Sequence, residues 1–160
     1  MKSFLERLMR HVRWADQRAL VSLRQSRATP PEAVRLFAHL VTADRIYLSR
    51  ARSEDPFPQD FWPDLTLDKA ARTAADVGDA LIELVRRATD VQLDRPVRYR
   101  NSKGDYFETP LQQLLTHVAL HGEHHRGQIA RIIRASNGTP AETDFITFVR
   151  DEDPGQRVHP

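Results

Sequence analysis

Hydrophobic residues recur every three or four positions in four long segments of the chain, which is the spacing of one face of an α-helix. The first helix is expected from about residue 3 to 25, and the second from the proline pair at 30–31 to about residue 52. The third is expected over 67–89 and the fourth over 110–135. Four long helices with short connections are typical of a bundle. We therefore predict an all-α fold, an up-and-down four-helix bundle.

Two connecting segments have patterns of their own. Residues 53–65 contain three prolines and three aromatic residues, which excludes a continuous helix and favours a loop that packs on the core over a substrate lid. In residues 96–109, two short runs of alternating side-chain character flank a turn that ends in glycine. A small hairpin is therefore expected between helices 3 and 4. One domain is expected over residues 1–150, followed by a polar C-terminal tail over 151–160.

The composition is that of an ordinary globular protein, with 40% hydrophobic and 29% charged residues among 160. No segment approaches the about 20 apolar residues that span a bilayer, so no membrane partner is expected. The first residues are charged and lack the apolar stretch of a secretory signal. The absence of cysteine excludes disulfides and thiolate ligands. These features predict a cytoplasmic location.

The charge pattern argues against a nucleic-acid partner. The net charge is only +2, and most basic residues alternate with acidic ones, as in residues 13–18. A nucleic-acid footprint would instead concentrate basic residues on one face or in one segment. We therefore interpret the arginines as solvated helix surface.

The fourth predicted helix carries four histidines, and helical geometry ranks them. Residues four apart lie on one face, so the pair His121 and His125 and the pair His117 and His121 both have ligand spacing. At about 100° per residue, His125 falls within the apolar sector and His121 at its edge. His117 and His124 lie further round the helix. The apolar sector is defined by Leu111, Leu114, Val118, Ile129, Ile132 and Ile133. We prefer His121 and His125 as an inward pair.

A third imidazole is expected from the second helix, where His39 shares a face with Leu36 and Ala43. Taken alone, His39 is better explained as a core histidine bonded to a backbone carbonyl, and the histidine pair on the fourth helix is what favours a ligand instead. Together with His121 and His125 it provides three protein ligands, which leave one position open for water or substrate, as in catalytic zinc sites. The metalloprotease motif H-E-x-x-H is excluded, because Gly122 stands where that motif has glutamate.

The segment from His117 to Ile129, with residues 13–16 and 39–44, resembles the signature of the DinB-like (YfiT-like) metal-binding four-helix bundles. The resemblance covers nearly the whole chain. It implies a metal triad on His39, His121 and His125, zinc or nickel as the metal, and a homodimer. Related branches include bacillithiol and mycothiol S-transferases, a thiol-dependent isomerase and proteins described as hydrolases. Asp16 stands where many relatives have asparagine, and Asp44 where many have glutamate.

The preferred functional hypothesis is a divalent-metal-dependent enzyme that transfers a low-molecular-weight thiol to a small electrophile, or that hydrolyses its substrate. Tyr47, Trp62 and Arg126 are candidate lining residues, and no catalytic residue is assigned. The alternative is a non-catalytic, metal-binding homodimeric bundle, in which Asp44, His117 or a glutamate from elsewhere in the chain completes a closed coordination shell. A metal lowers the pKa of a bound thiol or water, which suits the first hypothesis.

Overall fold

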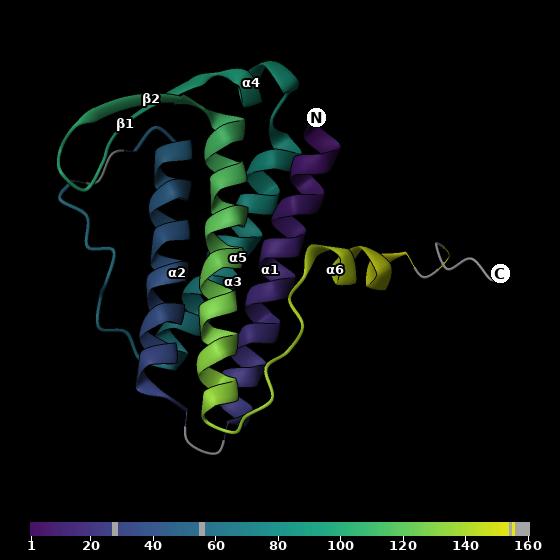
Figure 1. Ribbon diagram of the computed structural model, residues 1–160. Helices are drawn as coiled ribbons and strands as arrows, with labels where there is room; N and C mark the ends of the chain where they lie inside the picture. The colour runs from purple at the N-terminus through teal and green to yellow at the C-terminus, as the bar shows by residue number, and fades with distance from the viewer. Residues whose placement is uncertain (27–28, 55–56, 154, 156–160) are drawn as a thin grey trace.

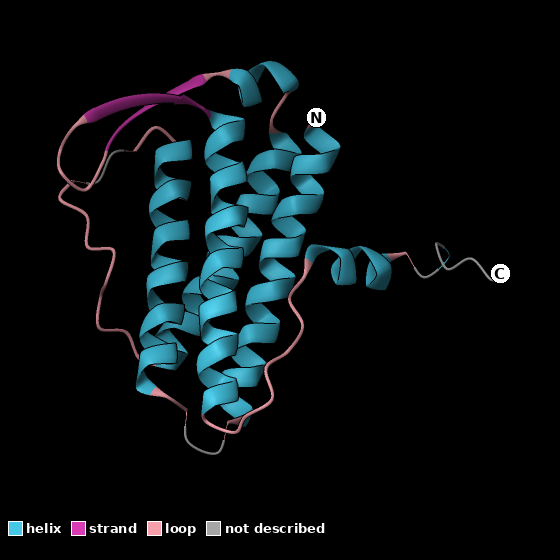
Figure 2. Cartoon of the chain, in the orientation of Figure 1, coloured by secondary structure: helices cyan, strands magenta, loops and turns pink. Residues whose placement is uncertain are grey.

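The computed structural model describes residues 1–26, 29–54, 57–153 and 155, which form a four-helix bundle with a two-stranded hairpin across one end (Figure 1). The four long helices are α1 (Lys2–Gln25), α2 (Pro31–Ala51), α3 (Leu67–Arg87) and α5 (Leu111–Ala135). The shorter elements are α4 (Asp90–Asp94), β1 (Pro96–Arg100), β2 (Tyr106–Pro110) and α6 (Phe145–Glu152). Helices dominate the cartoon (Figure 2). The prediction of an all-α bundle with a hairpin between its third and fourth long helices is confirmed.

Local capping explains where α3 and α4 begin. The side chain of Thr66 accepts a hydrogen bond from the backbone N–H of Lys69 and so caps α3. Thr89 and Gln92 form a reciprocal capping box at the start of α4. The sequence contains the Thr-x-x-Gln pattern that is typical of such a capping box. The hydrophobic periodicity, however, predicts only that the third helix ends near Thr89, and not that a short helix begins there.

Two apolar clusters show the direction of each helix. At the hairpin end, the cluster combines the start of α1 and α5 with the end of α2 and α3: Leu5, Met9, Val12, Leu48, Ala51, Val77, Leu81, Val85, Ala88, Leu93, Val97, Leu111, Leu114, Leu115, Val118 and Ala119. At the other end, the second cluster combines the end of α1 and α5 with the start of α2 and α3. Its residues are Ala19, Leu23, Ala33, Phe37, Ala38, Leu40, Val41, Ala70, Ala74, Ile129, Ile132 and Ile133. Helices α1 and α5 therefore run one way, and α2 and α3 run the other way.

The connectivity departs from a simple up-and-down order at one point. The segment between α2 and α3 returns along the side of the bundle, so that α3 starts at the same end as α2 (Figure 1). Helices α1 and α2 each pack against α3 and α5, and they occupy opposite corners of the bundle. This arrangement places α2 directly against α5, and it leaves the returning loop beside α2.

The hairpin is tied to the bundle through an arginine. Strands β1 and β2 pair antiparallel, with Tyr99 opposite Phe107. The side chain of Asn101 accepts hydrogen bonds from the backbone N–H groups of Lys103 and Asp105 and so closes the turn. The guanidinium of Arg50 on α2 donates to the carbonyl oxygen of Arg100 at 2.8 Å. The predicted turn and hairpin are thus present.

The apolar segment near the C-terminus forms α6 and packs on α1. Phe148 is buried, and its ring centroid lies 5.5 Å from that of Trp14 and 5.6 Å from that of His11. Helix α6 extends across the expected boundary between the domain and the tail at residue 150. Of that tail, residues 154 and 156–160 lie outside the described residues. None of the helices in the described part of the chain has the length and apolar character needed to cross a membrane.

Leu81→Ala is expected to lower the free energy of unfolding by about 2–5 kcal/mol, because it opens a cavity in a close-packed core. Leu81 is 0% exposed, whereas Val91 is 80% exposed. Urea unfolding in the presence of a chelator measures the effect on the metal-free protein. Val91→Ala serves as the control and is expected to change stability by less than about 0.5 kcal/mol. Similar losses in both variants would contradict this core assignment.

Candidate metal centre

The structure brings together the three histidines that the sequence singles out, His39 from α2 and His121 and His125 from α5. One ring nitrogen of each histidine lies within 4.8 Å of those of the other two. Among the described residues, this is the group of three side chains whose ligand atoms are close enough to share one ion. Their ring centroids are 4.4–5.3 Å apart. No fourth histidine or carboxylate within the described residues joins this group. The cluster could therefore hold a metal ion with an open coordination position.

The imidazoles of α2 and α5 point towards each other because of their positions on the two helices. The four-residue spacing of His121 and His125 places both rings on the face of α5 that packs against α2. His39 lies on the opposing face of α2 and is 7% exposed, while His125 is 8% exposed. The rings meet where the two antiparallel helices cross, so the site depends on their contact rather than on either helix alone.

Hydrogen bonds fix the orientation of two rings. The Nδ1–H of His39 donates to the carbonyl oxygen of Phe61 at 2.7 Å. The Nδ1–H of His125 donates to the side-chain oxygen of Gln128 at 2.8 Å. Both acceptors lack a proton to give, so each ring keeps its proton on Nδ1 and presents the lone pair of Nε2. Metal-binding histidines are held in this way.

The spacing of the nitrogens matches a shared ion. The Nε2 atoms of His121 and His125 are 3.1 Å apart. Two nitrogens bound to a tetrahedral zinc at its usual bond length lie about 3.3 Å apart. In addition, Nδ1 of His121 is buried and has no hydrogen-bond partner among the described residues. The facing Nε2 atoms at this separation fit two ligands of one ion, whereas the unpaired Nδ1 of His121 lacks the hydrogen bond that usually orients a metal-binding histidine.

The electrostatics keep all three imidazoles neutral. Burial, followed by the neighbouring His125 and His39, lowers the pKa of His121 to about 3. Burial is also the main cause that lowers the pKa of His39 and of His125. Neutral imidazole is the metal-binding form, so protons do not compete for these nitrogens near neutral pH.

The loop between α2 and α3 covers one side of the centre. The indole of Trp62 stacks on the ring of His39, with centroids 3.7 Å apart and an angle of 9° between the planes. Next to it, the carbonyl of Phe61 accepts the hydrogen bond from His39. Arg50 anchors the loop from α2, because its guanidinium donates to Gln59 at 2.8 Å and lies over the ring of Phe61. The loop thus packs on the site, as its aromatic content predicts.

The remaining histidines of α5 lie outside the cluster. His117 is exposed, and its ring packs on Tyr47 at 4.7 Å. His124 is exposed and accepts a hydrogen bond from the amide of Gln128. Tyr47 also lies under the guanidinium of Arg50. The runner-up pair of His117 with His121 is therefore not the one that the structure brings to His39.

A buried ion pair lies next to the histidines and is not apparent from the sequence. Arg126, expected as a lining residue, instead points towards α1 and donates to Asp16 at 2.7 Å and to Glu123 at 3.1 Å. Its guanidinium passes close to Gly122, where an added Cβ would lie 2.8 Å from Nη1. The glycine in the histidine segment thus provides the space that lets Arg126 reach Asp16. Its spacing of four residues from Arg126 is the only local signal of this contact.

Asp44 is the least compensated acid of this region. It is 2% exposed, and its Oδ1 has no hydrogen-bond partner among the described residues. Burial, and then the negative charge of Asp16, raise the pKa of Asp44 well above its usual range, while Arg126 opposes the rise. Burial raises the pKa of Asp16 too, although Arg126 opposes that rise as well. The interior therefore favours a protonated carboxyl at Asp44.

Comparison with known proteins identifies the family. The family model described as "DinB family" matches residues 1–157. The chain belongs to the DinB family. A curated relative, Protein DinB of Bacillus subtilis (strain 168), is 35% identical over 58 residues. This match spans 36% of the chain but only 34% of the relative. No solved structure matches the chain.

Asp44→Asn is expected to stabilise this DinB-family protein increasingly as the pH rises above about 4. The folded-state pKa of Asp44 is raised, so the native state holds this proton more tightly than the unfolded chain. As the pH rises from the pKa of Asp44 in the unfolded chain to its pKa in the folded protein, the wild type loses stability. The asparagine side chain has no proton to release, so the variant does not lose stability in this way. Urea unfolding of the metal-free protein over a pH series measures the difference. The exposed Asp76→Asn controls for loss of charge, and a difference between Asp44→Asn and wild type that does not vary with pH would refute the expectation.

Proposed function

We propose that this protein is an enzyme that depends on one divalent metal ion, zinc or nickel. The ion binds to His39, His121 and His125. The reaction that we propose is the transfer of a low-molecular-weight thiol to a small electrophile. The observation that carries the proposal is the convergence of three neutral imidazoles without a fourth protein ligand among the described residues. An open coordination position is what separates catalytic from structural zinc sites.

The chain's own groups have defined roles in this proposal. A divalent ion at the histidines would lower the pKa of a thiol or water that reaches the open position. The carbonyl of Phe61 and the side chain of Gln128 keep His39 and His125 in the tautomer that binds a cation. The indole of Trp62 covers the ring of His39 and excludes water from that side.

Thiol transfer suits the site better than hydrolysis. Hydrolysis usually needs a general base beside the attacking water. No carboxylate among the described residues belongs to the histidine cluster. Glu123, the acid nearest in sequence to His121 and His125, accepts a hydrogen bond from Arg126. A thiol bound as thiolate needs no such base. The family that the sequence resembles has bacillithiol and mycothiol S-transferases among its related branches, which supports the same choice.

The alternative is a non-catalytic bundle, a homodimer that its metal ion stabilises. One observation favours it: His39 and His125 are 7% and 8% exposed, so that an ion between them is largely shielded by protein. The two hypotheses share the three histidine ligands. They differ in whether the loaded protein turns over a substrate.

The first test concerns the ligands. Wild type dialysed against zinc or nickel is expected to retain about one ion per chain, as measured by plasma mass spectrometry. His39→Ala, His121→Ala and His125→Ala each remove a ligand and are expected to lose the ion. His117→Ala removes an imidazole of the same helix from outside the cluster and is expected to keep it. Metal retained in all three ligand variants, or lost in His117→Ala, would overturn the assignment.

The second test concerns turnover. The zinc- or nickel-loaded protein is expected to accelerate consumption of at least one small thiol by an electrophile such as chlorodinitrobenzene. Chelation or His125→Ala should reduce the rate by at least about 100-fold, since a bound metal is worth several kcal/mol of transition-state stabilisation. Nitrophenyl acetate without thiol tests hydrolysis in parallel. A metal-loaded protein that melts higher than the metal-free one but turns over neither substrate would favour the alternative.

A further inference from the structure

A cavity lies at the hairpin end of the bundle, away from the histidines. It has a volume of about 450 Å³ and is formed by the ends of α2 and α3, by α4 and by the start of α5. Ala51 follows His39 by twelve residues, and Leu111 precedes His121 by ten, which correspond to about 18 Å and 15 Å along the helices. The cavity is thus separate from the metal centre, and its size is within the usual range for small ligands.

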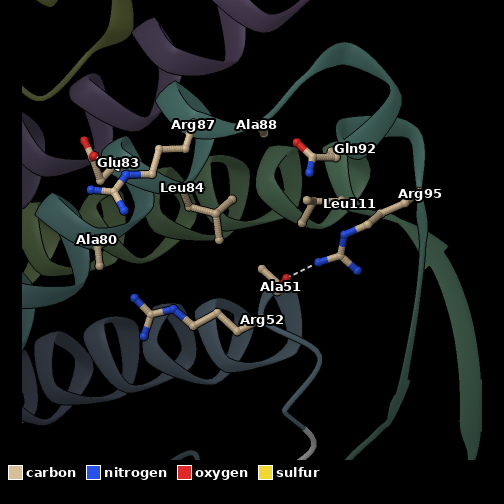
Figure 3. A pocket seen from close by; sticks show the side chains of 10 residues that line it. All are labelled: Ala51, Arg52, Ala80, Glu83, Leu84, Arg87, Ala88, Gln92, Arg95 and Leu111. Atoms are coloured by element: carbon tan, nitrogen blue, oxygen red, sulfur yellow. Dashed lines mark hydrogen bonds and ion pairs between the residues drawn. The ribbon is translucent and has the colours of Figure 1, made fainter.

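The interior of this cavity is apolar. Ala51 and Leu111 are each 2% exposed, Ala88 is 8% exposed, and the half-buried Leu84 projects between α2 and α3 (Figure 3). Alanines on both facing helices leave the hollow, because their side chains are too short to meet across it. An apolar ring or short chain would bury its surface against these residues.

The rim of the cavity is basic. Three arginines line it, Arg52 from the end of α2, Arg87 from α3 and Arg95 before the hairpin, against the single carboxylate of Glu83. Arg87 is paired with Glu83, and Arg95 donates to the carbonyl oxygen of Ala51 (Figure 3). Arg52 makes no side-chain hydrogen bond or ion pair with any residue in the described part of the chain. One guanidinium at the opening is therefore free to bind an anion.

Helix ends alone explain part of this charge but not the cavity. Basic side chains near the carboxyl ends of α2 and α3 stabilise the helix dipoles, each equivalent to roughly half a negative charge. Three guanidinium groups against one carboxylate and two such dipoles still leave the rim positive. A dipole effect also requires no hollow lined with alanine and leucine. Charge and shape together point to a ligand.

We propose that this cavity binds a small organic anion with an apolar body. Its carboxylate or phosphate group would pair with the guanidinium of Arg52, whose planar donors match both groups. Its apolar body would lie on Leu84 and Leu111. The proposal is independent of the metal centre and of the reaction there.

Nuclear magnetic resonance of the zinc-loaded, nitrogen-15-labelled full chain tests it with three probes of similar size: benzoate, phenyl phosphate and the neutral benzyl alcohol. The backbone amide signals of Leu84, Ala88 and Leu111 are expected to shift with an anionic probe and to shift far less with the alcohol. Whichever anion binds more tightly identifies the preferred group. Signals that shift only around His121 and His125, or equally with the alcohol, would overturn the proposal.

Variants give the matched controls. Arg52→Gln is expected to weaken binding of the anion by about three- to fivefold, which is the size of an exposed ion pair. Ala80→Leu fills the cavity and should abolish binding, with circular dichroism as the check on folding. Arg72→Gln removes an exposed arginine of α3 outside the cavity and should leave binding unchanged. Equal affinities for wild type, Arg52→Gln and Ala80→Leu would refute the site.

Discussion

The antiparallel contact between α2 and α5 is the interaction on which the metal centre depends. Helix α5 supplies two imidazoles and α2 one, so neither helix can hold a cation with three ligands alone. Apolar clusters pack the same two helices together on either side of the histidines, with Leu48 and Leu115 at the hairpin end and Phe37 and Ile129 at the other. Since such cores are close-packed, they restrict how far the two helices and their rings can shift. The centre is therefore a property of the whole bundle.

Between those two clusters lies a polar layer that a purely structural bundle does not need. Asp16, Asp44 and Arg126 come from three different helices and are each at most 3% exposed. In sequence each lies between residues of one apolar cluster and residues of the other. Burying charged groups costs more than an apolar replacement of the same volume in many proteins. This polar layer, which lies near the histidines, therefore lowers the stability of the bundle. Such a loss is expected where a fold is adapted to a functional site rather than to stability alone.

What the sequence predicts well is what depends on local periodicity. The four long helices and the shared face of His121 and His125 follow from steps of three and four residues. Trp62 is a candidate lining residue from the sequence alone, but its stacking on His39 and the hydrogen bond to the carbonyl of Phe61 are not predictable, because they depend on how a loop docks on α2. The pair of Arg126 with Asp16 joins residues 110 positions apart, and its one local signal is Gly122, four residues before Arg126. The parallel course of α2 and α3 likewise follows from the path of one long connection, which periodicity does not describe.

The docked loop gives metal binding a consequence beyond the three ligands. His39 donates to the carbonyl of Phe61 only while the loop is in place, and that hydrogen bond keeps Nε2 available for a cation. Ion binding and loop docking must therefore favour each other by the same free energy, as linkage requires. A substrate that displaces Trp62 from His39 would weaken the hold on the ion, whereas one that packs against Trp62 would strengthen it.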